Sequence, residues 1–156
     1  DRCKKNDWFK LKKKPDILIL EGWCVGAKPE NKKSLNIPIN ILEKNADKKK
    51  IWRSYVNNQL KSKYSKLFDQ LDSLLYLKAK NFKLLKRWRL KQEKKLKMKS
   101  GTKKNSKIMN EREVETFMMT YQRITQNMFK NAPKYSSAVI DLNENHQIKK
   151  VKFKHA

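Results

Sequence analysis

The feature that most constrains the fold is a short apolar run, Ile17-Leu18-Ile19-Leu20, which follows Pro15 and Asp16. Successive side chains of a β-strand point to opposite faces, so a strand that is apolar at every position needs cover on both sides. A parallel sheet with helices on each face supplies that cover. We therefore predict a central strand at 16–20 in an α/β fold, and the run is far too short for the ~20 residues of a membrane span.

Helical spacing and capping residues predict the next elements. Asp47 can cap a helix that runs to about residue 68, and a second apolar run at 74–77 is typical of another strand. Asn81 can cap a helix that continues to about residue 99, where Ser100-Gly101 ends it. A basic link follows at 102–107.

The C-terminal third carries the clearest helix signal. Asn110 is followed by Glu113 three residues later, which is a capping-box pattern, and apolar residues then recur on one helical face. Short strands are predicted at 137–142 and 148–153, the second alternating apolar residues with lysine. Strands and helices in this order describe a layered α/β domain.

The polar stretch 28–46 shows neither helical nor strand periodicity. It contains Pro29 and Pro38, and we predict a long loop there. Loops of this length commonly carry function or are disordered.

The formal charge of +25 raises the question of nucleic-acid binding. The basic residues are mostly lysines in four separate clusters, and asparagine is abundant, as AT-rich codon usage produces. Base recognition favours arginine forks and stacking aromatic residues, which this pattern does not offer. We therefore expect no specific nucleic-acid partner, and keep a basic nucleic-acid-binding protein as the alternative function.

The two cysteines, Cys3 and Cys24, form neither a CxxC motif nor a zinc-finger spacing with His146 or His155. Two cysteines do not make a disulfide framework, so a reducing cytoplasm is the expected compartment.

Glu21 comes directly after the predicted strand at 16–20. In open α/β sheets, ligands bind beyond the carboxyl ends of the strands, so a carboxylate here could hold the water shell of Mg²⁺ or accept a proton from an attacking hydroxyl. Gly22 would let a ligand approach the backbone closely. The alternative is that Glu21 is only a turn residue.

Several short motifs lie in a fixed order along the chain. The run 16–27 ends its apolar segment in Glu21-Gly22-Trp23, and further motifs follow at 38–43, 52–57, 82–93 and 117–123, while Asp1-Arg2 opens the chain. This ordered set resembles the D-glycerate 3-kinase-like P-loop kinases, relatives of uridine kinase and phosphoribulokinase, over nearly the whole sequence.

The resemblance implies a P-loop NTPase-type parallel sheet with flanking helices, of which residues 1–156 would be the C-terminal portion. It assigns a specificity loop to 28–46, a lid-like region to 82–107 and the C-terminal helix and strands to 110–153. The implied activity is ATP-dependent and Mg²⁺-dependent phosphorylation of a small hydroxyl compound, with D-glycerate first. Glu21 would be the catalytic carboxylate near Mg²⁺, and the implied substrate or phosphate contacts are Arg2, Gly22, Trp23, Arg89 and Arg123.

Helical spacing leaves alternatives for the arginines. Arg89 lies over Gln92 and Glu93 at helical spacing, so it could pair with them instead of a phosphate. For Arg87 a surface ion pair is preferred. Arg123 lies on the helical wheel opposite Val114, away from the core face, where it could reach a ligand or be solvated.

The sequence also departs from the family. Its three glycines, Gly22, Gly26 and Gly101, do not form a G-x-x-x-x-G-K-[ST] loop, so the motif that cradles the β- and γ-phosphates is not in this sequence. We therefore expect these 156 residues alone to be inactive. A degenerate kinase relative that no longer turns over remains a further alternative.

Overall fold

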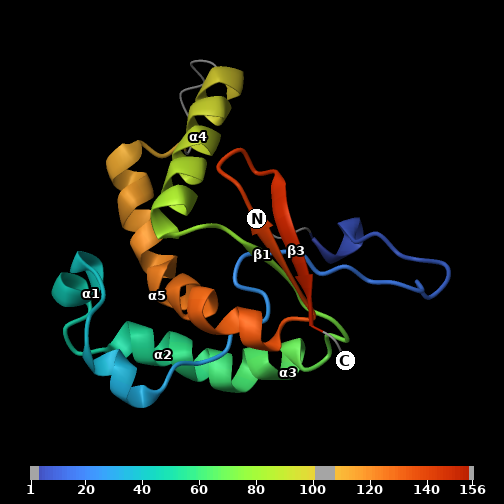
Figure 1. The fold of residues 1–156 in the computed structure, drawn as a ribbon, viewed down its shortest axis with the longest axis horizontal. Coiled ribbons are helices and arrows are strands. Elements are labelled where there is room, and N and C mark those ends of the chain that lie inside the picture. The colour runs from blue at the N-terminus through green and yellow to red at the C-terminus, as the bar shows by residue number, and fades with distance from the viewer. Residues whose placement is uncertain (1–3, 101–107, 155–156) are drawn as a thin grey trace.

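The computed structural model describes residues 4–100 and 108–154, and its sheet has three strands (Figure 1). They are β1 (Leu75–Lys78), β2 (Ala138–Leu142) and β3 (Ile148–Phe153), in the order β1-β2-β3. β1 and β2 are parallel, whereas β2 and β3 are antiparallel with an irregularity beside Asp141. The protein is therefore a mixed α/β structure, in which the predicted strands near 74–77, 137–142 and 148–153 are confirmed.

The predicted strand at 16–20 is not formed. Residues 17–20 belong to no helix or strand, and the side chains of Ile17, Leu18 and Ile19 are 79–84% exposed. A strand that is apolar on both faces needs a neighbouring strand and two covering layers, and the described sheet ends at β1 without reaching this segment. The sequence pattern identifies a segment whose composition suits a sheet. It does not show whether a neighbouring strand is available for pairing.

The predicted helices are present, although the one expected from Asp47 begins at Ile51. The helix expected at 47–68 is a nearly continuous run made of α2 (Ile51–Gln59), a π-helical turn at 60–64 and α3 (Ser65–Phe68). α4 (Phe82–Ser100) starts where the Asn81 side chain accepts the amide of Leu84, at 2.9 Å. α5 (Glu111–Tyr135) starts with the predicted capping box. The rest of the lid-like region, 101–107, lies outside the described residues.

The segment 28–46 is more ordered than the predicted loop. It contains a 3₁₀ helix, Lys32–Asn36, and the short helix α1 (Ile41–Ala46). The side chains of Asn31 and Asn40 accept backbone amides at the starts of these two helices. Capping by asparagine thus orders a polar stretch that has no apolar period of its own.

The core lies where α5 meets β1 and the α2–α3 run (Figure 1). Ala27 and Leu60 are buried against Met128 and Ala132 of α5. Partly buried side chains surround them: Cys24, Phe68, Tyr76, Ile124 and Tyr135. α5 therefore positions both the turn at 21–26 and the segment 28–46.

Candidate active site

The Glu21-Gly22-Trp23 turn lies on the surface and is anchored by its tryptophan. The Trp23 ring stacks on Phe117 of α5, with ring centroids 6.1 Å apart, and meets Tyr121 edge-on at 4.9 Å. Trp23 remains 53% exposed, and Glu21 and Gly22 are exposed beside it. The turn is therefore fixed to α5 while its carboxylate faces solvent.

Arg89 of α4 reaches the same aromatic ring. Its guanidinium carbon lies 5.3 Å from the Phe117 centroid. Nη1 donates to Gln92 Oε1 at 2.8 Å, and Nη2 forms an ion pair with Glu93 Oε1 at 2.5 Å. The pairing that helical spacing allowed is thus present. Nε is buried and has no partner among the described residues, so Arg89 keeps donors that these contacts do not use.

Glu93 holds this arginine in place. Its carboxylate is almost fully buried, with one oxygen on Arg89 and the other accepting the backbone amide of Met109 at 3.0 Å. Glu93 therefore links α4 to the residues just before α5. The position of the guanidinium is fixed by a buried carboxylate on one side and by the Phe117 ring.

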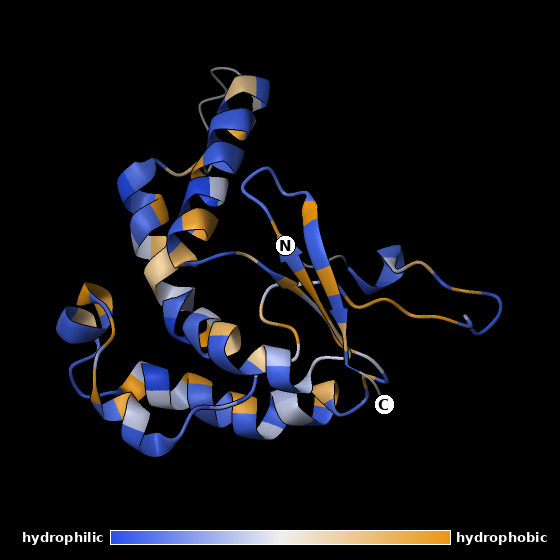
Figure 2. Ribbon diagram, in the orientation of Figure 1, coloured by the Kyte–Doolittle hydropathy of each residue, from blue (hydrophilic) through white to orange (hydrophobic). Residues whose placement is uncertain are grey.

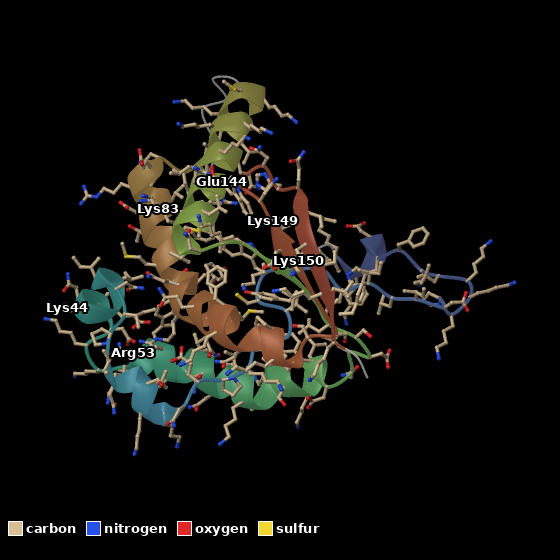
Figure 3. All side chains as sticks on the ribbon, in the orientation of Figure 1. Lys44, Arg53, Lys83, Glu144, Lys149 and Lys150 are labelled. Atoms are coloured by element: carbon tan, nitrogen blue, oxygen red, sulfur yellow. The ribbon has the colours of Figure 1, made fainter. Side chains whose placement is uncertain are left out.

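The turn between β2 and β3 supports α4 from another direction. Glu144, in this turn beside α4 (Figure 3), pairs with Arg87 at 2.6 Å, and its carbonyl accepts Trp88 Nε1 at 2.9 Å. The Trp88 ring also stacks on His146, with centroids 4.1 Å apart. Arg87 thus has the surface ion pair that was preferred for it, with Glu144 as partner.

Arg123 is buried, which excludes the solvated alternative that its place on the helical wheel left open. Nε and Nη2 donate to the two carboxylate oxygens of Glu43, at 2.7 and 2.6 Å. Nη1 donates to Glu30 and to the carbonyl of Ser34, and Nη2 also donates to the carbonyl of Ile37. These contacts engage all five N–H donors of a guanidinium. The segment 30–43 folds over this side of α5, which no helical wheel reveals.

A second buried arginine, Arg53, links the segment 30–47 to α2. Arg53 (Figure 3) forms an ion pair with Asp47 at 3.0 Å and donates from Nε to the carbonyl of Leu35 at 2.7 Å. Asp47 also accepts the amides of Trp52 and Arg53 in the first turn of α2, although the N-cap residue itself is Lys50. Two arginines on different helices therefore both hold the segment 30–47.

The cavity beside these arginines is small. It has a volume of about 30 Å³ and is lined by both polar side chains, among them Glu43 and Arg123, and apolar ones, among them Val56 and Leu60. Such a volume accommodates water rather than a three-carbon acid. We interpret this network as the support of the segment 28–46.

The charges of this network shift the pKa values of its members. Burial by itself would raise the pKa of Glu43, but hydrogen bonds from Arg123 and the Ile39 amide outweigh it and hold that pKa below its ordinary 4.5. Asp47 behaves similarly: burial opposes ionisation, and the amides of Trp52 and Arg53 lower its pKa below 3.8. Its hydrogen bond to Glu43 raises the pKa of Arg123.

These shifts predict a loss of stability in acid. Because both carboxyl groups have lower pKa values when folded, the unfolded chain takes up protons first as pH falls. Their contribution is complete above about pH 5 and is lost as the pH falls through the lowered folded values. Urea denaturation between about pH 6 and pH 2.5 should show this decline, and Glu43→Gln should make it shallower. An unchanged pH dependence in this variant would exclude Glu43 as a source.

The predicted site residues fall into separate places. Glu21, Gly22 and Trp23 share a turn, and Trp23 and Arg89 meet at Phe117. Arg123 belongs to the buried network, and Arg2 lies outside the described residues. The aromatic pair Phe117 and Tyr121, spaced four residues apart in α5, is the sequence signal for the ring on which these parts converge.

Across residues 4–100 and 108–154, no group of three or more His, Cys, Asp or Glu side chains is placed to hold a metal ion. Glu21 is an exposed carboxylate, which suits Mg²⁺ only where substrate phosphates and water supply the other ligands. No helix in this part of the chain is long and apolar enough to cross a membrane.

Two known proteins resemble this chain. D-glycerate 3-kinase from Cryptococcus neoformans var. grubii superposes with a TM-score of 0.69 over 92% of this chain and 51% of its own, at 20% identity, which shows a shared fold. The uncharacterized kinase mug58 of Schizosaccharomyces pombe is 32% identical over 123 residues, 78% of this chain and 41% of that kinase. The chain is therefore kinase-like and has the fold of D-glycerate 3-kinase. It spans about half the length, or less, of these relatives, and no protein-family model matches it.

Proposed function

We propose that this kinase-like chain carries the acceptor side of an ATP-dependent, cytoplasmic small-molecule kinase. Its substrate class is a small hydroxy acid, with D-glycerate first because the structural neighbour is named for that substrate. The observation that carries the proposal is the meeting of Trp23 and Arg89 at Phe117, although 66 residues separate them (89 − 23). The exposed Glu21 lies two residues before Trp23 in the chain, and Arg89 keeps a donor, Nε, that no described residue uses.

The chemistry of phosphoryl transfer fits these groups. Most of the catalysis in such transfer comes from positioning and from neutralising the charge on the phosphoryl oxygens. Arg89 is oriented by Glu93 and Phe117 and would supply part of that neutralisation. Glu21 would hold water of a Mg²⁺ shell or accept the proton of the substrate hydroxyl. Arg123, whose donors are all engaged, would keep the specificity segment 28–46 in shape.

Tight binding of the nucleotide requires a phosphate-binding loop, which this sequence does not contain. When bound, ATP would supply the phosphoryl group and Mg²⁺ would neutralise its charge. Phosphate affinity in P-loop enzymes comes from a ring of backbone amides and one lysine, and the sequence has no such loop. Arg89 would contact phosphate oxygens and Glu21 the water shell of Mg²⁺. The loop of backbone amides that binds the β- and γ-phosphates is not in this sequence.

Replacing Glu21 by Gln should lower kcat of the full-length gene product at least about tenfold while leaving the fold intact, because it removes a magnesium-shell or base function from an exposed position. The measurement is ADP release with D-glycerate as acceptor. Asp16→Asn neutralises an exposed carboxylate five residues earlier in the chain. It serves as control and should leave kcat unchanged. Equal turnover in wild type and Glu21→Gln would remove Glu21 from the mechanism.

A further inference from the structure

α4 is held from two directions. Toward α5, Arg89 lies over the Phe117 ring, and the buried Glu93 accepts a backbone amide just before α5. In another direction, Trp88 contacts the turn between β2 and β3, at residues 143–147. Adjacent residues of an α-helix point about 100° apart, which lets neighbouring side chains reach different elements. Trp88 is adjacent to Arg89, so a shift of Trp88 also shifts the backbone from which Arg89 extends.

The turn 143–147 is shaped by its own hydrogen bonds. Oδ1 of Asn143 accepts the amides of Asn145 and Gln147, at 2.9 and 3.0 Å. The amide of Asn143 donates to the carbonyl of Gln147 at 2.9 Å. His146 has a φ of 64°, in the left-handed region that closes a turn of this kind. None of these features involves α4, so the turn offers that helix a preformed surface.

The contact between this turn and α4 depends on Trp88. Its Nε1 donates to the carbonyl of Glu144 at 2.9 Å, and its ring stacks on His146 with centroids 4.1 Å apart. The turn consists of hydrophilic residues (Figure 2), so it offers no apolar side chain to bury against the helix. Arg87 adds an ion pair with Glu144, but both side chains are mostly exposed and such pairs stabilise little. The stack and the indole hydrogen bond therefore fix α4 to the turn.

The guanidinium of Arg89 moves with α4. Nη1 bonds to Gln92 and Nη2 to Glu93, both on the same helix, and Nε has no partner among the described residues. Only the contact with the Phe117 ring reaches another element. Misplacing a group in a reaction site by about 1 Å can lower the rate about 100-fold. The attachment of α4 is therefore a determinant of where Arg89 lies.

We propose that the turn 143–147 positions α4 for phosphate transfer, and that Trp88 and His146 are positioning residues that act through Arg89. The inference rests on the proposed function, because it requires Arg89 to meet phosphate. The attachment of α4 to the turn is a property of the fold and can be measured without catalysis.

The first test is His146→Asn in the full-length gene product. It removes the stacked ring, and asparagine tolerates the left-handed backbone, so the turn keeps its shape. ADP release with D-glycerate as acceptor should show a kcat lowered about tenfold. Arg87→Met is the control. It removes only the exposed ion pair between the same two elements and should leave kcat within about twofold of wild type.

Combination with Arg89→Lys tests whether His146 acts through that arginine. If it does, His146→Asn should slow the Arg89→Lys enzyme no further, because the group that it positions is already replaced. Two independent effects would multiply instead. Should His146→Asn fail to fold, as judged by circular dichroism, Trp88→Phe takes its place, since it keeps a ring and loses the indole N–H.

Amide hydrogen exchange of the same variants measures the attachment itself. His146→Asn should speed exchange in α4 about tenfold and leave α5 unchanged. Unchanged exchange in α4, an unchanged kcat in an active enzyme, or multiplying effects in the double variant would each overturn the proposal. A wild type that transfers no phosphate would contradict the proposed function instead, and faster exchange in α4 would still support the attachment to the turn.

Discussion

Replacing Arg123 by Met should lower the free energy of unfolding by about 3–5 kcal/mol, the usual cost of leaving a buried charge without its partner. The side chain of Glu43 is fully buried and would lose both of its hydrogen bonds from the guanidinium. The carbonyls of Ser34 and Ile37 would lose donors as well. Urea denaturation at neutral pH measures the difference between variant and wild type.

Arg87→Met is the matched control for this experiment. Arg87 also pairs with a glutamate, Glu144, but both side chains are mostly exposed, so the change should cost less than about 1 kcal/mol. Similar losses in the two variants, or none for Arg123→Met, would show that burial of the Arg123 network does not stabilise the segment 28–46. Should Arg123→Met fail to fold, Arg123→Lys provides a milder test, because it keeps the charge but lacks the five-donor fork.

Replacing Arg89 by Lys should lower kcat/KM for phosphate transfer roughly 10- to 100-fold in the full-length gene product, with little change in stability. Lysine keeps the positive charge and can still pair with Glu93, so the link between α4 and Met109 is preserved. What it loses is the planar fork and the donors that the contacts with Gln92 and Glu93 leave unused.

The same substitution separates a functional role from a structural one. If Arg89 only stabilises α4 through Glu93, the lysine variant should retain full activity, and Arg89→Met should lower stability alone. Kinetics of both variants, measured beside their thermal unfolding midpoints, decide between the two roles. Full activity of Arg89→Lys would contradict the assignment of Arg89 to the phosphate site.

Elements fixed by neighbouring residues could be predicted from the sequence. The capping box of Asn110 and Glu113 begins α5, and Asn81 caps α4. Asp47 accepts first-turn amides of α2 from a position before its N-cap, Lys50. The alternating lysines of β3 identified an edge strand within its observed bounds. In each case the decisive contacts lie within a few residues, where spacing alone determines which groups can meet.

Features that depend on distant segments could not be predicted in this way. Arg123 and Glu43 are 80 residues apart, and nothing in the period of α5 indicates that a loop covers that face. Asn40 and Glu43 repeat the spacing of Asn110 and Glu113, so the start of α1 had a local signal that the prolines obscured. The segment 17–20 had the correct composition for a strand, but pairing requires a neighbour that composition does not provide.

We propose that the Glu21-Gly22-Trp23 turn and Arg89 serve phosphate transfer to a small hydroxy acid. Transfer of labelled γ-phosphate from ATP to D-glycerate by the full-length gene product tests it most directly. We expect labelled phosphoglycerate to form in a magnesium-dependent reaction that Glu21→Gln slows at least about tenfold. A folded, full-length product that transfers no label to glycerate or to any other small hydroxy compound would contradict the account.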